Sequence, residues 1–374
     1  MIAPRPAVER RVLESLEAGR IPVLLGGCGS GRTSLLLRVE SRLGPTAAQY
    51  LDVAAAATTP ERCLSAITSV SRFGTAVSEP PASPRDAFDL LLSFLSGATT
   101  SAGAPATFLL DDFLDVRTLE NFPGLRHVQR DFVQRLASSP ARFVLASRFT
   151  ARVHRLLRDA PPRFEVMHVP PLDADEVTEL LRLFNGSART AGGTAALVAD
   201  LTAGRPACAH LVLGAMAGMG PAPDPVAALA SLFAPDGRLT ARCRESYELR
   251  LGRARGFGAL KAILGVLAET EPQNLTEISH ALHRTPGSTK DYLSWLEDVD
   301  LVAVRSKRYV FEDPLLRLYV RLYGRPVPPG DDDVVREVGA YARRSMPAAA
   351  AVATGTGSSS PPAVPDRSGI IEID

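Results

Sequence analysis

Within residues 1–172, short runs of apolar residues alternate with longer amphipathic stretches. The runs are partly β-branched or aromatic, which favours strands. The predicted strands are Ile21–Leu25, Gln49–Val53, Thr107–Leu110, Phe143–Ala146 and Val166–Val169. The stretches between them have helical spacing and predict helices over Ser34–Arg42, Pro60–Val70, Arg85–Leu95, Leu125–Ala137 and Thr150–Leu157. This alternation predicts an α/β fold, in which helices cover both faces of a parallel sheet.

The pattern becomes purely helical from residue 173 onward. Apolar residues at helical spacing predict helices over Asp175–Leu183, Thr194–Thr202 and Pro206–Met216. We therefore expect residues 173–255 to form a helical lid and a connector that follow the α/β core of residues 1–172.

A different combination of elements follows within residues 256–344. Three helices are predicted over Gly258–Glu269, Leu275–His283 and Thr285–Glu297, and Thr285 with Pro286 suits the N-cap and first position of the third. Two short strands, Leu301–Val304 and Tyr309–Phe311, then enclose a basic turn. Three helices and a β-hairpin in this order predict a winged helix-turn-helix domain, which a helical extension completes.

The last segment, residues 345–374, is rich in Ala, Pro, Gly and Ser, and we expect a disordered tail because it cannot bury a core. It ends in the β-branched peptide Ile370–Asp374. One hypothesis is that this peptide docks on a protein partner by adding a strand to an exposed sheet edge. The alternative is a terminus without a role.

Composition narrows the classes of function. The chain has 374 residues, of which 45% are hydrophobic, and a net charge of +1, which gives no general sign of nucleic acid or an anionic membrane. The four cysteines lack paired spacing and predict reduced thiols rather than a disulfide framework or a zinc site. No signal-peptide core and no membrane-length apolar run is present in the sequence. We therefore expect a soluble, cytoplasmic protein.

A glycine-rich segment joins the first predicted strand to the next helix, and its spacing, Gly26-x4-Gly31-Arg32-Thr33, fits a Walker A motif. Glycines let backbone N–H groups turn toward phosphate oxygens, and the helix N-terminus adds partial positive charge. The residues predicted to bind ATP phosphates are Gly26, Gly27, Cys28, Gly29, Ser30, Gly31, Arg32, Thr33 and Ser34. The Thr33 hydroxyl is placed to bind Mg²⁺. The alternative is a plain glycine-rich turn.

Two residues of this loop depart from the usual pattern. Arg32 stands where lysine is usual, and a planar guanidinium does not replace a compact ammonium without consequence. Arginine still binds phosphate in a bidentate manner, so we expect nucleotide binding more readily than fast hydrolysis. Cys28 fits a tolerated small residue, and the alternative is a redox gate on nucleotide binding.

Acidic residues end the third predicted strand, in the order typical of a Walker B motif. Asp111 is predicted to hold Mg²⁺, directly or through water, and Asp112 to be the catalytic carboxylate that activates the attacking water. If Phe143–Ala146 lies between the strands that lead to the loop and to Asp111, then Ser147 and Arg148 follow it as candidate γ-phosphate sensors. The alternative for Arg148 is a surface position or a salt bridge.

The motifs GGCGSGRTSLL, FLLDD, RFVLASR, VPPLDADEVTELL and LTAGRPACAHLVL together resemble the signal-transduction ATPases with numerous domains, a branch of the AAA+ class that includes archaeal-type ATPases. The segment Asp313-Pro314-Leu315-Leu316-Arg317 after the hairpin is similar to a segment of the archaeal-type ATPases. The resemblance covers roughly residues 5–325. It implies an ATP-driven switch whose P-loop NTPase (AAA+-like) core has a five-stranded parallel sheet.

The resemblance also bears on a turn in the expected lid and on the arginine finger. Gly204-Arg205-Pro206 matches the family's Gly-x-Pro turn, so Pro206 is expected near the nucleotide and Arg205 as a sensor of it. No arginine finger is identified; Arg158 and Arg163 are the candidates.

The charge of the predicted winged helix argues against a duplex reader. Residues 257–324 hold eight basic and nine acidic residues, and the expected recognition helix, residues 285–297, has only Lys290 as a cation. We expect a regulatory switch that binds ATP with Mg²⁺, hydrolyses it slowly, acts through protein partners and is able to oligomerise. The alternatives are a DNA-binding ATPase and a non-hydrolysing, nucleotide-bound scaffold.

Overall fold

A five-stranded parallel sheet forms the centre of the first half of the chain. In the computed structural model, which describes residues 5–74, 80–185, 192–220, 223–252 and 256–346, the strands follow the order β2-β3-β4-β1-β5. They are β1 (Ile21–Leu25), β2 (Ala48–Asp52), β3 (Thr107–Asp111), β4 (Arg142–Ser147) and β5 (Phe164–His168), and every pair is parallel. The sheet confirms the predicted α/β fold with five parallel strands.

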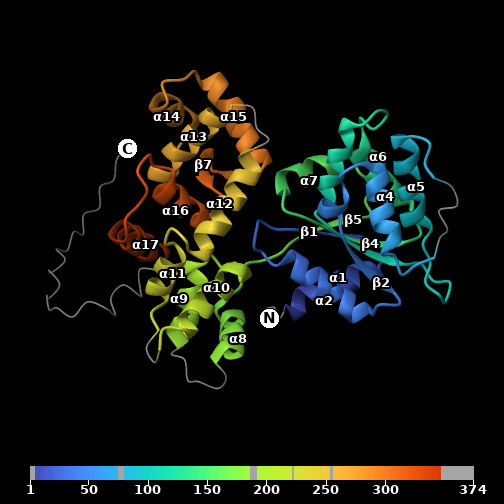
Figure 1. Cartoon of the computed structure of the whole chain (residues 1–374), viewed down its shortest axis with the longest axis horizontal. Helices are drawn as coiled ribbons and strands as arrows, with labels where there is room; N and C mark the ends of the chain where they lie inside the picture. Colours follow the sequence, from blue (N-terminus) through green and yellow to red (C-terminus); the bar gives the residue numbers. More distant parts are fainter. Residues whose placement is uncertain (1–4, 75–79, 186–191, 221–222, 253–255, 347–374) are drawn as a thin grey trace, which may run out of the picture.

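Helices cover both faces of this sheet (Figure 1). Because successive side chains of a strand face opposite sides, Val23 belongs to one core and Leu24 to the other. The helices α1 and α2 pack on the face of Leu24, and α4, α5 and α6 pack on the opposite face. The helices of this half are α1 (Pro6–Glu17), α2 (Arg32–Leu43), α3 (Val53–Ala56), α4 (Pro60–Ser69), α5 (Pro84–Gly97), the 3₁₀ helix η1 (Phe113–Asn121), α6 (Val128–Ser138) and α7 (Thr150–Leu157).

The edges of this half differ from the sequence prediction. The edge strand β5 begins two residues earlier than expected, since Glu165 interrupts its apolar pattern and faces Ser15, which donates a 2.8 Å hydrogen bond to it. Helix α1 was not predicted because five of its 12 residues are charged, although Val12 and Leu16 are buried four residues apart. Its Glu9 is also buried and pairs with Arg38 of α2.

The second half is helical apart from one hairpin. Its elements are α8 (Ala174–Asn185), α9 (Gly192–Leu201), α10 (Pro206–Ala217), α11 (Pro225–Leu232), α12 (Arg238–Leu251), α13 (Phe257–Glu269), α14 (Leu275–Ala281), α15 (Pro286–Asp298), β6 (Val302–Arg305), β7 (Arg308–Phe311), α16 (Pro314–Tyr323) and α17 (Asp331–Ser345). Thr285 caps α15 and Pro286 opens it, as predicted. Ser306 and Lys307 have positive φ angles and form the tight turn between β6 and β7.

One hydrophobic core runs through this second half, from Leu172 to Ala342. It joins α8–α12 to α13–α17 without a break, and Figure 1 shows these helices as one lobe beside the lobe of the sheet. The β6–β7 hairpin therefore shares its core with α10 and α12.

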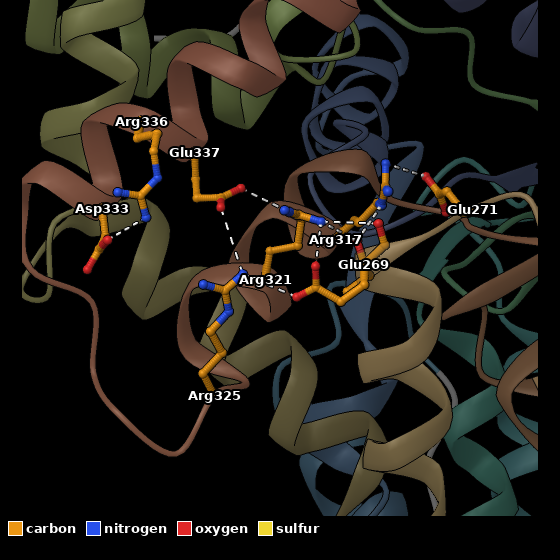
Figure 2. Close-up of polar contacts among 9 residues, drawn as sticks. Glu269, Glu271, Arg317, Arg321, Arg325, Asp333, Arg336 and Glu337 are labelled. Carbon is orange, nitrogen blue, oxygen red and sulfur yellow. Dashed lines mark hydrogen bonds and ion pairs between the residues drawn. The ribbon is translucent and has the colours of Figure 1, made fainter. Parts of the chain in front are cut away.

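Ion pairs fix α16 within this lobe (Figure 2). Arg317 lies 3.2 Å from Glu271, and its Nε donates to the Ala268 carbonyl at 3.1 Å. Arg321 pairs with Glu269 of α13 at 3.1 Å and with Glu337 of α17 at 3.0 Å. Arg317 of the Asp313–Arg317 segment therefore anchors α16 to the end of α13.

No helix in the described ranges is both long and apolar enough to cross a bilayer. Residues 347–374 lie outside the described residues, and these include almost all of the predicted tail and the whole of the peptide Ile370–Asp374.

Candidate functional site

The predicted site residues of the sheet meet at one edge. Because the carboxyl ends of parallel strands lie together, the loop after β1, the acids that end β3 and the residues that end β4 are neighbours. Strand β4 lies between β1 and β3, which is the arrangement on which the sensor assignment of Ser147 and Arg148 depended.

The loop Gly26–Gly31 needs glycine at several of its positions. Gly29 and Gly31 have φ angles of +83° and +88°, which strain any side chain. A Cβ atom on Gly26 would lie only 2.6 Å from the Ser30 hydroxyl oxygen. The α2 helix then begins at Arg32, so the loop leads straight into a helix N-terminus.

Three donors hold the carboxylate of Asp111, which is 4% exposed. The hydroxyls of Thr33 and Tyr50 donate to its Oδ2 at 2.5 and 3.2 Å, and the backbone N–H of Asp112 donates to its Oδ1 at 3.0 Å. Burial, assisted by Asp111, raises the pKa of Tyr50, which therefore remains a hydroxyl donor. A threonine hydroxyl against a carboxylate provides the hard oxygen ligands that Mg²⁺ prefers, so these residues fit the ion.

Two arginines surround Asp112. Arg148 Nη2 donates to its Oδ2 at 2.8 Å and also reaches Asp115 at 3.2 Å, whereas Arg32 Nη1 lies 3.5 Å from its Oδ1. Burial alone would lower the pKa of Arg148, but Asp112 and Asp115 outweigh it and raise the pKa above its ordinary value. Arg148 thus forms the salt bridge that was its alternative assignment, at the site itself. Ser147 is fully buried, and its hydroxyl accepts from the N–H of Phe149.

Arg32 is an incompletely satisfied buried cation. It is 8% exposed, and its Nε and Nη1 atoms have no hydrogen-bond partner. Burial lowers its pKa, and Asp112 and Asp111 oppose this effect. Burying a cation without full hydrogen bonding costs free energy. An anion within reach of this guanidinium would remove the cost.

A cavity of about 470 Å³ opens beside the loop, between residues 29–35 and the helices α10 and α12. Its lining includes five arginines and no carboxylate among the described residues; the arginines are Arg5, Arg32, Arg38, Arg238 and Arg242. Val169, Leu180 and Leu211 supply apolar surface. Cations and apolar side chains in one cavity suit a ligand that combines anionic groups with an apolar group.

His210 of α10 also lines this cavity. Its ring lies 4.8 Å from that of Phe184, and its Nδ1 atom is buried without a hydrogen-bond partner. Burial lowers the pKa of His210, which favours the neutral imidazole. A neutral imidazole adds a hydrogen-bonding group to the cavity without adding another positive charge.

The two residues assigned through the Gly-x-Pro turn have different surroundings. Pro206 lines the cavity, and its ring would lie 3.4 Å from a Cβ atom on Gly31. Arg205 does not line the cavity. It donates to the Cys28 carbonyl at 2.9 Å and pairs with Asp313 at 3.2 Å, which raises its pKa despite the opposing effect of burial.

Sequence reasoning missed Arg238 and Arg242 as residues of the cavity. The available signal was their spacing, since they stand four residues apart on one face of α12, whose first turn has no acidic residue. Of the arginine-finger candidates, Arg163 donates to four backbone carbonyls, those of Gly19, Leu136, Ala137 and Ser139. Arg158 is exposed after α7.

Cations of the hairpin form only a small exposed group. Arg308 lies 3.2 Å from Glu277 and also donates to the Pro272 carbonyl, whereas Arg305 and Lys307 are exposed. The hairpin therefore offers two cations without a carboxylate partner among the described residues.

Comparisons with known proteins identify the fold. No protein-family model and no curated protein matches the chain. Among solved structures, the Walker-type ATPase Paby2304 of Pyrococcus abyssi has a TM-score of 0.65 and 17% sequence identity, and the match covers 86% of this chain and 96% of that one. This likeness shows that the chain has a Walker-type, P-loop ATPase fold.

Two further similar structures have lower scores. The Holliday junction branch migration motor RuvB of Thermotoga maritima has a TM-score of 0.44 at 13% identity, with 83% of this chain and 92% of that chain covered. Cdc6p from Pyrobaculum aerophilum has a TM-score of 0.40 at 14% identity, with 92% and 97% covered.

Proposed function

We propose that this chain binds ATP with Mg²⁺ and acts as a regulatory switch of the signal-transduction ATPase type. The observation that carries the proposal is the cavity beside the glycine-rich loop, which five arginines line and to which no described carboxylate contributes. A triphosphate is strongly anionic, and such a site lowers the free energy of binding it. The faces of a purine ring are apolar, which matches the surface of Val169, Leu180 and Leu211.

The phosphates would lie against Gly29–Thr33 and the Arg32 guanidinium, all of which line the cavity. Thr33 and Asp111 would hold Mg²⁺, which would neutralise phosphate charge when bound. Arg32 would exchange its 3.5 Å contact with Asp112 for a phosphate oxygen. This exchange ties nucleotide binding to the release of the catalytic carboxylate.

Asp112 is the proposed base that orients water for hydrolysis of ATP to ADP and phosphate. Its carboxylate has Arg148 on one oxygen and Arg32 near the other, so both oxygens are already engaged and neither is free to orient a water molecule. Hydrolysis then requires both arginines to shift toward phosphate. We therefore propose slow turnover, as the replacement of lysine by Arg32 also suggests.

Arg205 supports the assignment as a switch. Its guanidinium joins the backbone of the loop, at Cys28, to Asp313 at the start of α16. A change in the loop on nucleotide binding would therefore act directly on α16. We propose that α13–α15 with β6 and β7 form a winged helix-turn-helix and that this unit, which shares its core with α10 and α12, transmits the change.

A protein partner suits this unit better than DNA. Arg308 is already paired with Glu277, so Arg305 and Lys307 are the cations that the described hairpin has available for phosphates. Duplex binding depends on the neutralisation of several backbone phosphates. We therefore propose an output through a protein surface.

Thermal unfolding of the full chain tests the proposal. A ligand at about 100 times its dissociation constant stabilises the folded state by about 2.7 kcal/mol, and we expect MgATP to raise the unfolding temperature by several degrees. ADP and GTP, measured in parallel, show how far the site depends on the third phosphate and on the base. An unchanged unfolding temperature with millimolar MgATP would contradict the proposal.

A further inference from the structure

We propose that Arg242 of α12, together with Arg238 one turn earlier, is a second phosphate-binding element that clamps the nucleotide from the side opposite the loop. This inference rests on the proposed function, because it assigns residues for the same ligand. It replaces Arg205, which the sequence resemblance offered as the sensor, with two residues that no motif marked.

Arg242 lies directly over the loop. Its Nη2 atom would be 3.2 Å from a Cβ atom on Gly29 and lies 3.9 Å from the Cys28 sulfur. Arg205 approaches the same segment elsewhere, since its Nη1 would be 3.2 Å from a Cβ on Gly27. Only Arg242 of the two lines the basic cavity. The two guanidiniums therefore have separate positions: one in the cavity, the other between the loop and α16.

The charge of Arg242 is not neutralised within the described part of the chain. Arg5, Arg32 and Arg38, which line the same cavity, each have a carboxylate within ion-pair distance. No described carboxylate pairs with Arg242 or with Arg238. The half-buried Arg242 thus faces the cavity with its charge available for an anion.

The position of this pair opposes helix stability. Arg238 and Arg242 are like charges at i and i+4, and they stand in the first turns of α12, where the helix dipole favours anions. Both effects lower the stability of α12, and an anion beside the pair would remove them. Arg32, buried and incompletely hydrogen-bonded on the opposite wall, points independently to an anion in this cavity.

Helix α12 connects this contact to the rest of its lobe. Leu239, Cys243 and Leu251 on its other face are buried in the core that also contains α16. Tyr247 packs edge-on against Tyr319 of α16, with ring centroids 6.0 Å apart. A polyphosphate held between Arg32 and Arg242 would therefore draw the lobe of α12 toward the lobe of the sheet.

Titration of the full-length protein with a fluorescent ATP analogue, followed by anisotropy with Mg²⁺ present, tests the inference. A charge-assisted contact contributes enough that Arg242→Ala is expected to weaken binding roughly 10- to 100-fold. Arg242→Lys should recover part of the loss, and Arg238→Ala should show a smaller loss. The matched control is Arg130→Ala, which removes an exposed arginine of α6 and should leave affinity unchanged.

Competition with unlabelled adenosine separates phosphate contacts from base contacts. Adenosine has no phosphate, so its affinity should be the same in wild type and Arg242→Ala. Arg242→Gln provides a second variant that keeps the length of the side chain if the alanine variant folds poorly. Wild-type affinity for the analogue in both folded variants would overturn the inference and leave the proposed function intact. No binding by wild type would overturn the proposed function, and the inference with it.

Discussion

At the scale of single residues, the site depends on the carboxylate of Asp112, which two arginines contact. Its two carboxylate oxygens face Arg148 and Arg32, and its φ angle of +46° places it in the left-handed region, which aspartate tolerates better than most residues. This sharp turn follows β3 directly, and the two adjacent acids have different partners, since the hydroxyls of Thr33 and Tyr50 donate to Asp111. In the proposed function, Asp111 would hold the metal ion and Asp112 would orient water.

Replacement of Asp112 separates binding from hydrolysis. Asp112→Asn removes the proposed base, and we expect turnover to fall by about 10²- to 10⁴-fold. Affinity for MgATP should remain or increase, because Arg32 loses its competing carboxylate. Steady-state phosphate release and nucleotide titration measure the two effects. Asp131→Asn, which removes a carboxylate of α6 that pairs with Arg85, is the control. Equal turnover in wild type and Asp112→Asn would refute the role of Asp112.

The candidate residues of the sheet edge could be predicted because their signals are local. Gly26–Ser34 and the pair Asp111-Asp112 each lie in consecutive sequence after an apolar strand, so chain connectivity alone brings them to strand ends. Arg242 could not be predicted in this way. It comes from a helix more than 200 residues after the loop, and only the packing of α10 and α12 places it there.

At the scale of elements, the segment Asp313–Arg317 has two structural tasks. Asp313 caps α16, since its Oδ1 accepts from the N–H of Leu315 at 3.0 Å, while its Oδ2 faces Arg205 at 3.2 Å. Pro314 occupies the first helical position, where a missing N–H costs nothing. Arg317 then anchors the helix to Glu271 (Figure 2). One short segment thus fixes α16 and links it to the loop.

Two substitutions of Asp313 distinguish these tasks. Asp313→Asn keeps an acceptor for the Leu315 N–H and loses the ionic contact with Arg205, whereas Asp313→Ala loses both. Loss of the cap should make the alanine variant less stable than the asparagine variant by about 1 kcal/mol. Chemical denaturation measures the difference. Equal stability of the two variants would show that the side chain of Asp313 does not cap α16.

Most elements could be predicted from apolar periodicity, and the misses have physical causes. Strand β1 is completely buried and was predicted to the residue, whereas the edge strand β5 is only partly buried and was placed two residues late. Helix α1 was missed because charged residues separate its apolar positions. Helices α16 and α17 were expected only as a helical extension without individual bounds.

At the scale of the whole molecule, two lobes meet away from the basic cavity at the start of α7. The N–H of Thr150 donates to Asp300 Oδ2 at 2.7 Å, and Arg155 of α7 pairs with Asp298. Asp300 therefore caps a helix of the other lobe. Burial raises the pKa of Asp300 to about 6, and the charge of Glu312 adds to this shift. Hydrogen bonds from Thr150 and Ala151 and the charge of Arg250 oppose it.

This contact makes stability depend on pH. A carboxyl group whose pKa is raised on folding binds its proton more tightly in the folded state, so stability falls as pH rises from about 4 to about 6. Asparagine resembles the protonated acid and tolerates the positive φ angle of residue 300. We expect Asp300→Asn to be more stable than wild type at pH 7, with the difference shrinking toward pH 5.

Thermal unfolding across this pH range checks the prediction, and Asp298→Asn at the same contact is the control. Asp298 pairs with the exposed Arg155, so its replacement should not reproduce the pH effect. If the difference in unfolding temperature between Asp300→Asn and wild type stayed constant from pH 5 to pH 7, the raised pKa of Asp300 would be contradicted.

The most direct test of the account is calorimetric titration of MgATP into wild type and Arg32→Ala. Arg32 is a buried cation whose Nε and Nη1 lack hydrogen-bond partners and whose contact with Asp112 is long at 3.5 Å, so its removal should leave the nucleotide-free fold intact. We expect saturable binding to wild type and at least a roughly tenfold weaker affinity in the variant. Absence of binding to wild type, or equal affinity in the two proteins, would contradict a nucleotide site at this loop.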